Sequence, residues 1–141
     1  MSVSVEPVVA KEACFRLDTD VDVVVARRGV HDWAKELGLT VVDLTKVVTA
    51  ASELARNAVV HGGGGVMCVQ VVCQAERKGL RVSFTDQGKG IPDIARAMQD
   101  GYTTGGGLGI GLPGAKRLVD EFALASTPTD GTCVTIVRWK V

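Results

Sequence analysis

The feature that constrains this chain most is a strand-like stretch that ends in Asp86. Three apolar residues before it alternate with polar ones, which is the period-2 pattern of a strand with one buried face. These residues are Leu80, Val82 and Phe84. Counting on by two, Asp86 falls on the same buried face, where an unpaired carboxylate carries a large desolvation cost. The pattern therefore predicts a carboxylate at the end of a strand, directed toward the core.

Two glycines, Gly88 and Gly90, follow this carboxylate. Glycine adopts positive φ readily and lets another group approach the backbone closely. An inward hydrogen-bond acceptor beside bare backbone suits the flat edge of a ligand such as a nucleobase. Asp and Gly are also common turn residues, so an ordinary turn after a strand explains residues 86–90 equally well.

Length and charge exclude several classes of protein. The chain has 141 residues, 46% of them hydrophobic, which is enough for one domain with a core. Lys plus Arg and Asp plus Glu each number 16, so the net charge is zero and argues against a nucleic-acid partner. No signal-peptide pattern and no apolar stretch of about 18 residues is seen. We therefore expect a single cytoplasmic domain over residues 1–141, without a membrane partner.

The four cysteines are Cys14, Cys68, Cys73 and Cys133. They form no CxxC pair and have no zinc-site spacing. Cys68 and Cys73 differ by an odd number, so on one strand they face opposite ways. The sequence therefore predicts four reduced cysteines in the core rather than a disulfide framework.

The periodicity along the chain predicts alternating strands and helices, with recognisable helix ends. Asp18 or Asp20 is expected to cap the first helix and Gly38 to end it, while Thr40 caps the second. His61, before the glycines at 62–65, is interpreted as a cap of the second helix rather than a catalytic group. The expected elements are a strand over 3–17, a helix ending near Leu37, a helix over Val41–His61, strands over Val66–Cys73 and Leu80–Asp86 joined by a turn at 76–79, a short helix over Ile91–Gln99, a helix over Pro113–Phe122, and strands over Phe122–Ser126 and Thr132–Trp139.

Glu53 and Asn57 lie four residues apart in the second expected helix, so they are neighbours on one face. At 100° per residue this face lies opposite the apolar stripe of the helix. A solvated polar face is one interpretation. A binding site is the other, and it requires a segment that covers this face over a ligand.

The segment from Gly101 to Gly111 carries six glycines and leads into a helix. Bare amides and the positive end of a helix dipole favour an anion such as phosphate, although a flexible loop is the alternative interpretation. The stretch 109–114 matches GxGxxG, but no apolar strand leads into it. The stretch 109–116 lacks the GK[ST] end of a Walker A loop.

Taken in order, four short motifs resemble the N, G1, G2 and G3 boxes of the GHKL ATPase superfamily. That group includes gyrase-type topoisomerases, histidine kinases and the anti-sigma-factor serine kinases. The motifs are Glu53-Leu-Ala-Arg-Asn57, Asp86-Gln-Gly-Lys-Gly90, Gly105-Gly-Gly-Leu-Gly-Ile-Gly111 and Gly131-Thr132. The resemblance covers almost the whole chain.

Within this superfamily, the chain most resembles the anti-sigma-factor serine kinases, and among them the RsbT-type switch kinase of the stressosome. The Gly-Leu-Pro-Gly and Asp-Glu-Phe elements favour this subgroup over kinases that bind a sigma factor directly. One departure is the glycine run at 62–65, where larger residues are expected. The matching stretches are Ala34–Gly38, Ser52–Asn57, Asp86–Asp93 and Gly106–Phe122.

The resemblance implies an α/β fold, a two-layer sandwich with helices packed on one face of a mixed, mostly antiparallel sheet (the Bergerat ATP-binding fold). ATP and Mg²⁺ would lie on the polar side of the second helix, under a lid over about 93–112. Asp86 would accept a hydrogen bond from the adenine amino group, with help from Thr132. Asn57 would coordinate Mg²⁺, and Glu53 would act as the general base. The implied nucleotide contacts are Asn57, Asp86, Gly88, Gly90, Ile91, Thr104, Gly105, Gly106, Gly107, Leu108, Gly109, Ile110, Gly111, Leu112 and Thr132.

The function implied by the resemblance is an ATP-dependent protein serine/threonine kinase in stress signalling. Its substrates would be STAS-domain proteins of a stressosome-like complex, and the released kinase would activate a PP2C-type phosphatase. Two alternatives stay open. One is a kinase that acts mainly by binding a sigma factor, and the other is a nucleotide-binding regulatory module with little turnover.

Overall fold

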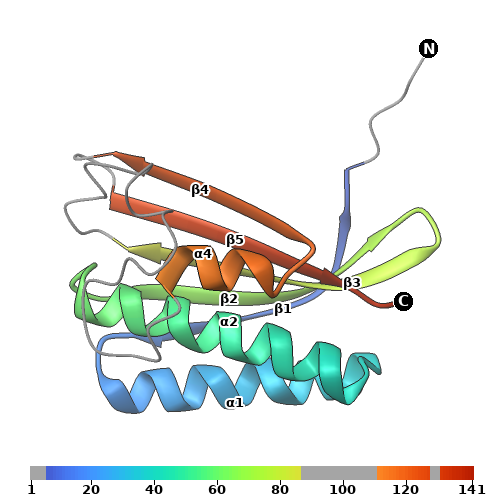
Figure 1. Cartoon of the computed structure of the whole chain (residues 1–141), viewed down its shortest axis with the longest axis horizontal. Helices are drawn as coiled ribbons and strands as arrows, with labels where there is room; N and C mark the ends of the chain where they lie inside the picture. Colours follow the sequence, from blue (N-terminus) through green and yellow to red (C-terminus); the bar gives the residue numbers. More distant parts are fainter. Residues whose placement is uncertain (1–5, 87–110, 128–130) are drawn as a thin grey trace.

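The computed structural model describes residues 6–86, 111–127 and 131–141, and these form two layers (Figure 1). Five strands make one sheet in the order β1-β2-β3-β5-β4, and all four pairings are antiparallel. Helices pack on one face of this sheet, which confirms the expected two-layer α/β class. The elements are β1 (Val8–Leu17), α1 (Asp20–Leu37), α2 (Val41–Val60), β2 (Gly65–Gln74), β3 (Arg77–Asp86), α4 (Gly111–Arg117), β4 (Glu121–Thr127) and β5 (Gly131–Trp139).

Helix α1 begins at a capping box centred on Thr19, not at the predicted Asp18 or Asp20. The hydroxyl of Thr19 accepts from the amide of Asp22, and the Asp22 carboxylate accepts from the amides of Asp18 and Thr19. These backbone hydrogen bonds lower the pKa of Asp22 from its ordinary value. At the other end, Gly38 closes the helix with φ 92°, as the sequence predicts.

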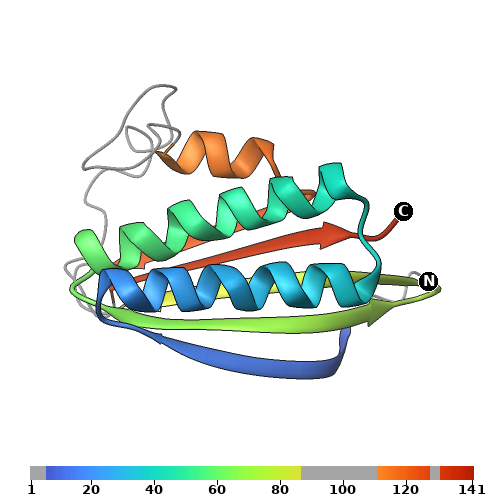
Figure 2. The same cartoon turned by 90° about the horizontal axis from the view of Figure 1, so that it is seen from below.

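Helix α2 lies between α1 and α4 in the helical layer (Figure 2). Its cap is Thr40, whose hydroxyl accepts from the amide of Asp43 at 3.1 Å, as expected. Half of its eight buried residues are alanines, and these small side chains suit a helix packed between the sheet and two neighbours. They are Ala50, Ala51, Ala55 and Ala58.

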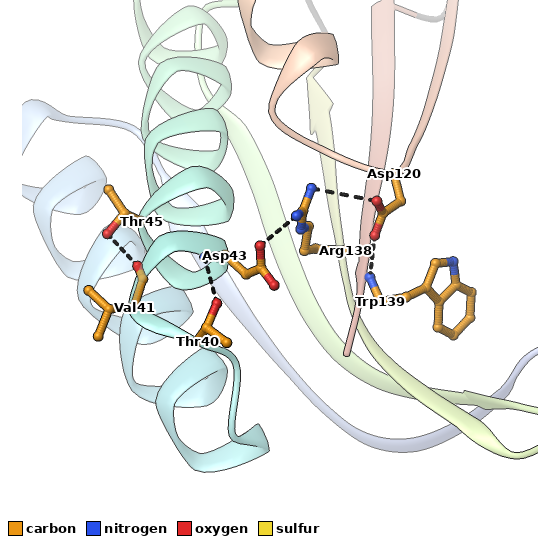
Figure 3. A network of polar contacts seen from close by, with 7 residues as sticks. All are labelled: Thr40, Val41, Asp43, Thr45, Asp120, Arg138 and Trp139. Carbon is orange, nitrogen blue, oxygen red and sulfur yellow. Dashed lines mark hydrogen bonds and ion pairs between the residues drawn. The ribbon is translucent and has the colours of Figure 1, made fainter. Parts of the chain in front are cut away.

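Near its beginning, helix α2 is joined to strand β5 by a hydrogen bond from Arg138 to Asp43 (Figure 3). Nη2 of Arg138 lies 2.5 Å from Oδ1 of Asp43, and its Nη1 lies 3.5 Å from Oδ1 of Asp120. Oδ2 of Asp120 accepts from the amide of Trp139 at 2.7 Å. This network holds the start of α2 against the end of β5. The hydrogen bond from Arg138 lowers the pKa of Asp43.

Several predicted boundaries differ from the structure, among them the start of β1, which lies at Val8 rather than at residue 3. The turn between β2 and β3 lies at residues 75–76, with Ala75 at φ 54°, because both strands extend further than their apolar patterns. Helix α4 ends at Arg117 rather than at Phe122. Phe122 belongs to β4, where it pairs with Ile136 of β5 and packs on the core. The period-2 pattern of β4 therefore begins where the helix was expected to continue.

The prediction of four reduced core cysteines is wrong. Cys14 and Cys68 are direct partners in the pairing of β1 with β2, and they form a disulfide. Both side chains point away from the helices, and Cys14 is exposed. Cys73 and Cys133 are free and half-buried. The pairing follows from the register of two strands, which the spacing of the cysteines in the sequence does not contain.

Candidate functional site

Asp86 ends strand β3 with its carboxylate on the helix-covered face of the sheet, as the alternation predicts. The three apolar residues before it on this face are at most 3% exposed: Leu80, Val82 and Phe84. Asp86 itself is 9% exposed. Its Oδ1 accepts a hydrogen bond from the amide of Thr132 at the start of β5, 3.2 Å away. The neighbouring strand therefore helps to orient this buried carboxylate.

Glycines surround Asp86 where side chains would fill the space beside it. A Cβ on Gly62 would lie 2.5 Å from the Asp86 Cγ, and one on Gly131 would lie 2.2 Å from the Asp86 carbonyl oxygen. Gly65, which pairs with Asp86 across the sheet, would meet the carbonyl of Thr85 at 2.0 Å. Part of the unexpected glycine run at 62–65 thus has a structural reason, because it approaches the end of β3 closely.

Thr132 lies on the same face of the sheet as Asp86. Its hydroxyl is 3.0 Å from the hydroxyl of Ser126, its partner on β4. It alternates with Val134 and Ile136, both buried in the core. The hydroxyls of Thr132 and Ser126 therefore lie beside the Asp86 carboxylate, and the three groups form a polar end on a sheet face that is otherwise apolar.

Glu53 and Asn57 lie in the C-terminal half of α2. Glu53 is only 4% exposed and Asn57 is half-buried, so the alternative of a solvated polar face is wrong for Glu53. The carbonyl of Asn57 accepts from the amides of His61 and Gly62, at 2.9 and 3.2 Å. The helical turn that carries Asn57 therefore leads directly into the glycine that contacts Asp86.

The beginning of α4 lies at the same end of the molecule as the end of α2 and the end of β3 (Figures 1 and 2). It begins at Gly111, with φ 58°, and both Gly111 and Leu112 are buried. The remaining predicted contacts lie outside the described residues, as do the short helix expected over 91–99 and the lid up to residue 110. They are Gly88, Gly90, Ile91, Thr104, Gly105, Gly106, Gly107, Leu108, Gly109 and Ile110.

Three residues that shape this site were not among the nucleotide contacts expected from the sequence, although Gly131 belongs to the fourth motif and Gly62 to the glycine run at 62–65. Gly62 and Gly131 form walls around Asp86, and Ser126 contacts Thr132. Each glycine stands just outside a predicted strand or helix, a position where a close backbone approach can be suspected. Ser126 shares the period-2 face of Phe122 and Leu124, which was the available signal for it.

The side chains present fit an adenine nucleotide and Mg²⁺. A buried carboxylate between glycines can accept a hydrogen bond from a flat amino-substituted ring. The Asn57 amide oxygen is a hard ligand, and Mg²⁺ usually takes one or two protein oxygens and completes its shell with phosphate and water. Within residues 6–86, 111–127 and 131–141, no group of three or more His, Cys, Asp or Glu side chains is placed to hold a metal by itself. No helix in these ranges is both long and apolar enough to cross a membrane.

The chain belongs to the histidine kinase-like ATPase domain family, which matches residues 15–138. It is 46% identical to the serine/threonine-protein kinase RsbT of Bacillus subtilis (strain 168) over 128 residues, covering 91% of this chain and 96% of that protein. It is 30% identical to the anti-sigma F factor of Thermoanaerobacter sp. (strain X514) over 120 residues, covering 81% and 82%. The predicted superfamily and enzyme class, an ATP-binding protein serine/threonine kinase, are confirmed by these matches.

A solved structure shares the fold. It is the crystal structure of the RsbU and RsbW domains of Rv1364c from Mycobacterium tuberculosis, with a TM-score of 0.64 and 24% identity. The match covers 92% of this chain and 32% of that one, so this chain spans about a third of its length. This likeness confirms the α/β architecture.

Proposed function

We propose that this kinase transfers the γ-phosphate of ATP to a serine or threonine hydroxyl of a STAS-domain protein, in a partner-switching system of the RsbT type. The observation that carries the proposal is the meeting of Asp86, in its glycine cradle, with the turn of α2 that bears Asn57 and follows Glu53. The proposed site thus combines Asp86, a buried hydrogen-bond acceptor for a nucleobase, with Glu53, a carboxylate that can accept the proton of a hydroxyl group.

Asp86 is the residue that selects adenine in this proposal. Its carboxylate accepts a hydrogen bond from the exocyclic amino group, and the Thr132 amide holds the carboxylate in place. A hydrogen bond to a charged group contributes about 1.5–3 kcal/mol, and the low exposure of Asp86 favours the upper part of this range.

Glu53 is the general base in this proposal. Its burial on α2 keeps the carboxylate away from bulk water, and helical packing fixes its direction. It accepts the proton of the incoming hydroxyl and orients the oxygen toward the γ-phosphate. Phosphoryl transfer requires mainly positioning and charge neutralisation, so one well-placed carboxylate is the principal acid–base group.

Asn57 would hold Mg²⁺ through its side-chain oxygen, a hard ligand of the kind that this ion takes. When bound, Mg²⁺ neutralises charge on the phosphates. Asn57 lies one helical turn after Glu53 on the same face, so the metal and the base share one wall of the site. The amides of 107–111 are proposed to hold the phosphates.

The proposed partners follow from the resemblance to RsbT. Phosphorylation of a STAS-domain protein adds a charge of about −1.5 to −2, which weakens its interface with the kinase by repulsion and desolvation. The released kinase then binds and activates a PP2C-type phosphatase, in the cytoplasm. A second candidate function is inhibition of a sigma factor by direct binding, which the match to the anti-sigma F factors favours.

A phosphotransfer assay separates these functions. The full chain is incubated with labelled ATP, Mg²⁺ and a STAS-domain protein encoded beside it, followed by phosphoamino-acid analysis. The proposal expects acid-stable phosphoserine or phosphothreonine on the STAS protein. Acid-labile phosphohistidine, or hydrolysis of ATP without labelled protein, contradicts it. Binding of a sigma factor to the chain in a parallel pull-down, together with no label on the STAS protein, supports the second function instead.

A further inference from the structure

We propose that Cys14 and Cys68 form a reversible redox site that clamps the edge strand β1 to β2 when oxidised. The two residues are direct register partners, with Cα atoms 4.0 Å apart, and they are joined by a disulfide. They lie on the sheet face away from the helices, whereas the proposed nucleotide site lies on the helix-covered face. The proposal therefore does not depend on the proposed function.

The position of the pair makes the disulfide accessible. Strand β1 is an edge of the sheet, since among the described strands it pairs with β2 alone. Cys14 is exposed and Cys68 is half-buried. Exposed disulfides are the ones that exchange readily with external thiols, in contrast to those buried in a core. Both an oxidant and a reductant can thus reach the pair in the folded protein.

The β1–β2 pairing does not depend on this covalent bond. β1 pairs with β2 from Val8 to Leu17, interrupted only by a bulge near residue 10. Leu17 is fully buried, and Phe15 packs so closely under α1 that a Cβ on Gly29 would lie 2.5 Å from its ring. On the outer face, Gln70 donates to Glu12 of β1. We therefore expect the reduced protein to remain folded.

The redox step balances with hydrogen peroxide as the oxidant. The accessible sulfur of Cys14 attacks peroxide, so an S–O bond forms, the O–O bond breaks and water leaves. The sulfur of Cys68 then attacks the sulfenic acid, so the S–S bond forms, the S–O bond breaks and a second water leaves. The two thiol protons end in the two waters, and peroxide takes up two electrons. A dithiol reverses the change by thiol–disulfide exchange.

The oxidised bond closes a long loop and should stabilise the fold. The cysteines are 54 residues apart in sequence, and the segment between them contains α1 and α2. Cross-links that close longer loops remove more entropy from the unfolded chain. Oxidation is therefore expected to raise the melting temperature by roughly 5–10 °C. Because Asp86 and Glu53 lie on the other side of the sheet, ATP affinity should stay within about twofold, well below the tenfold that corresponds to 1.4 kcal/mol.

The experiment compares the full chain after treatment with peroxide and with dithiothreitol. Peptide mapping should find a Cys14–Cys68 disulfide after peroxide and two free thiols after the reductant, without denaturant in either step. Thermal unfolding should show the higher melting temperature only for the oxidised sample. The Cys14→Ser and Cys68→Ser variants should lose this difference. The matched control, Cys73→Ser with Cys133→Ser, should keep it.

Four results would overturn the proposal. One is equal melting temperatures for the oxidised and reduced wild type, and another is a bond that dithiothreitol reduces only in denaturant. The third is peroxide-induced pairing through Cys73 or Cys133 in place of Cys14 and Cys68. The fourth is unfolding of the wild type upon reduction, which makes the disulfide a structural requirement and not a reversible site.

Discussion

A Cβ on Gly62 would lie 2.5 Å from the Cγ of Asp86, so the end of α2 meets the end of β3 with no side chain between them. This contact links two motifs that are far apart in the sequence. The helix carries Glu53 and Asn57, and the strand carries Asp86. Their meeting brings two distant parts of the chain together at the proposed nucleotide site.

Substitution Gly62→Ala should weaken ATP binding by about tenfold or more, which corresponds to about 1.4 kcal/mol or more. The new methyl group requires the Asp86 carboxylate to move, because the closest atoms of that side chain lie well inside van der Waals contact. Calorimetry with ATP measures the change. Gly63→Asn is the matched control, since Gly63 has φ 72° with open space around it and asparagine tolerates this conformation. Equal affinities for both variants and the wild type contradict the proposed contact.

Substitution Glu53→Gln should slow phosphotransfer by about 10²–10⁴-fold, which is the usual contribution of a general base. ATP affinity should change little, because the amide keeps the size of the buried side chain. Single-turnover transfer to a STAS-domain protein measures the rate. The control is Glu76→Gln, an exposed residue in the turn between β2 and β3. A normal transfer rate in Glu53→Gln shows that this carboxylate is structural.

Substitution Asn57→Ala should remove the effect of Mg²⁺ on ATP binding. The wild type is expected to bind ATP more tightly with Mg²⁺ than with a chelator, whereas the variant should bind equally in both. The reason is the loss of the only protein oxygen proposed to hold the ion. Titration of ATP with and without Mg²⁺ is the measurement. If the variant keeps the full effect of Mg²⁺ on ATP binding, Asn57 does not hold the metal and the proposal is wrong.

Because of the ion pair between Asp43 and Arg138, the free energy of unfolding should decrease at acidic pH. Since Arg138 lowers the pKa of Asp43 in the folded protein, the pair stabilises the fold above the ordinary carboxyl pKa. This contribution is lost as the pH falls below about 4, through the lowered pKa. Asp43→Asn should therefore melt several degrees lower than the wild type at pH 7, with a smaller gap at pH 3.

The matched control for this pair is Asp32→Asn, because Asp32 is exposed and pairs with the similarly exposed His31 beside it in sequence. Its melting temperature should follow that of the wild type at both values of pH. A constant gap between Asp43→Asn and the wild type from pH 7 to pH 3 contradicts the assigned role of the charge.

The sequence predicted the direction of Asp86 correctly because one strand with one buried face has a fixed period. Periodicity did not predict whether Glu53 is buried or exposed. A polar residue opposite an apolar stripe is expected at the surface, and periodicity within one helix contains no information about what covers its polar face. Glu53 is nevertheless 4% exposed, which is a consequence of tertiary packing.

The cysteine pair shows a second limit of sequence analysis. Cys14 meets Cys68 only because of the β1–β2 register, which includes a shift between Val9 and Lys11. A shift of one residue turns a strand's side chains to the other face, so register must be known before a cross-strand pair can be predicted. The end of α4 was misplaced for a related reason, since Phe122 fits a helical stripe and a strand face equally well.

The affinity of the Asp86→Ala variant for ATP, measured by calorimetry, tests the central claim most directly. The matched control is Thr85→Ala, since Thr85 is exposed and points to the opposite face of the same strand. We predict that Asp86→Ala folds and binds ATP about tenfold to a hundredfold more weakly than the wild type, while Thr85→Ala binds normally. An unchanged affinity of a folded Asp86→Ala variant would contradict the assignment of this carboxylate to the nucleotide site.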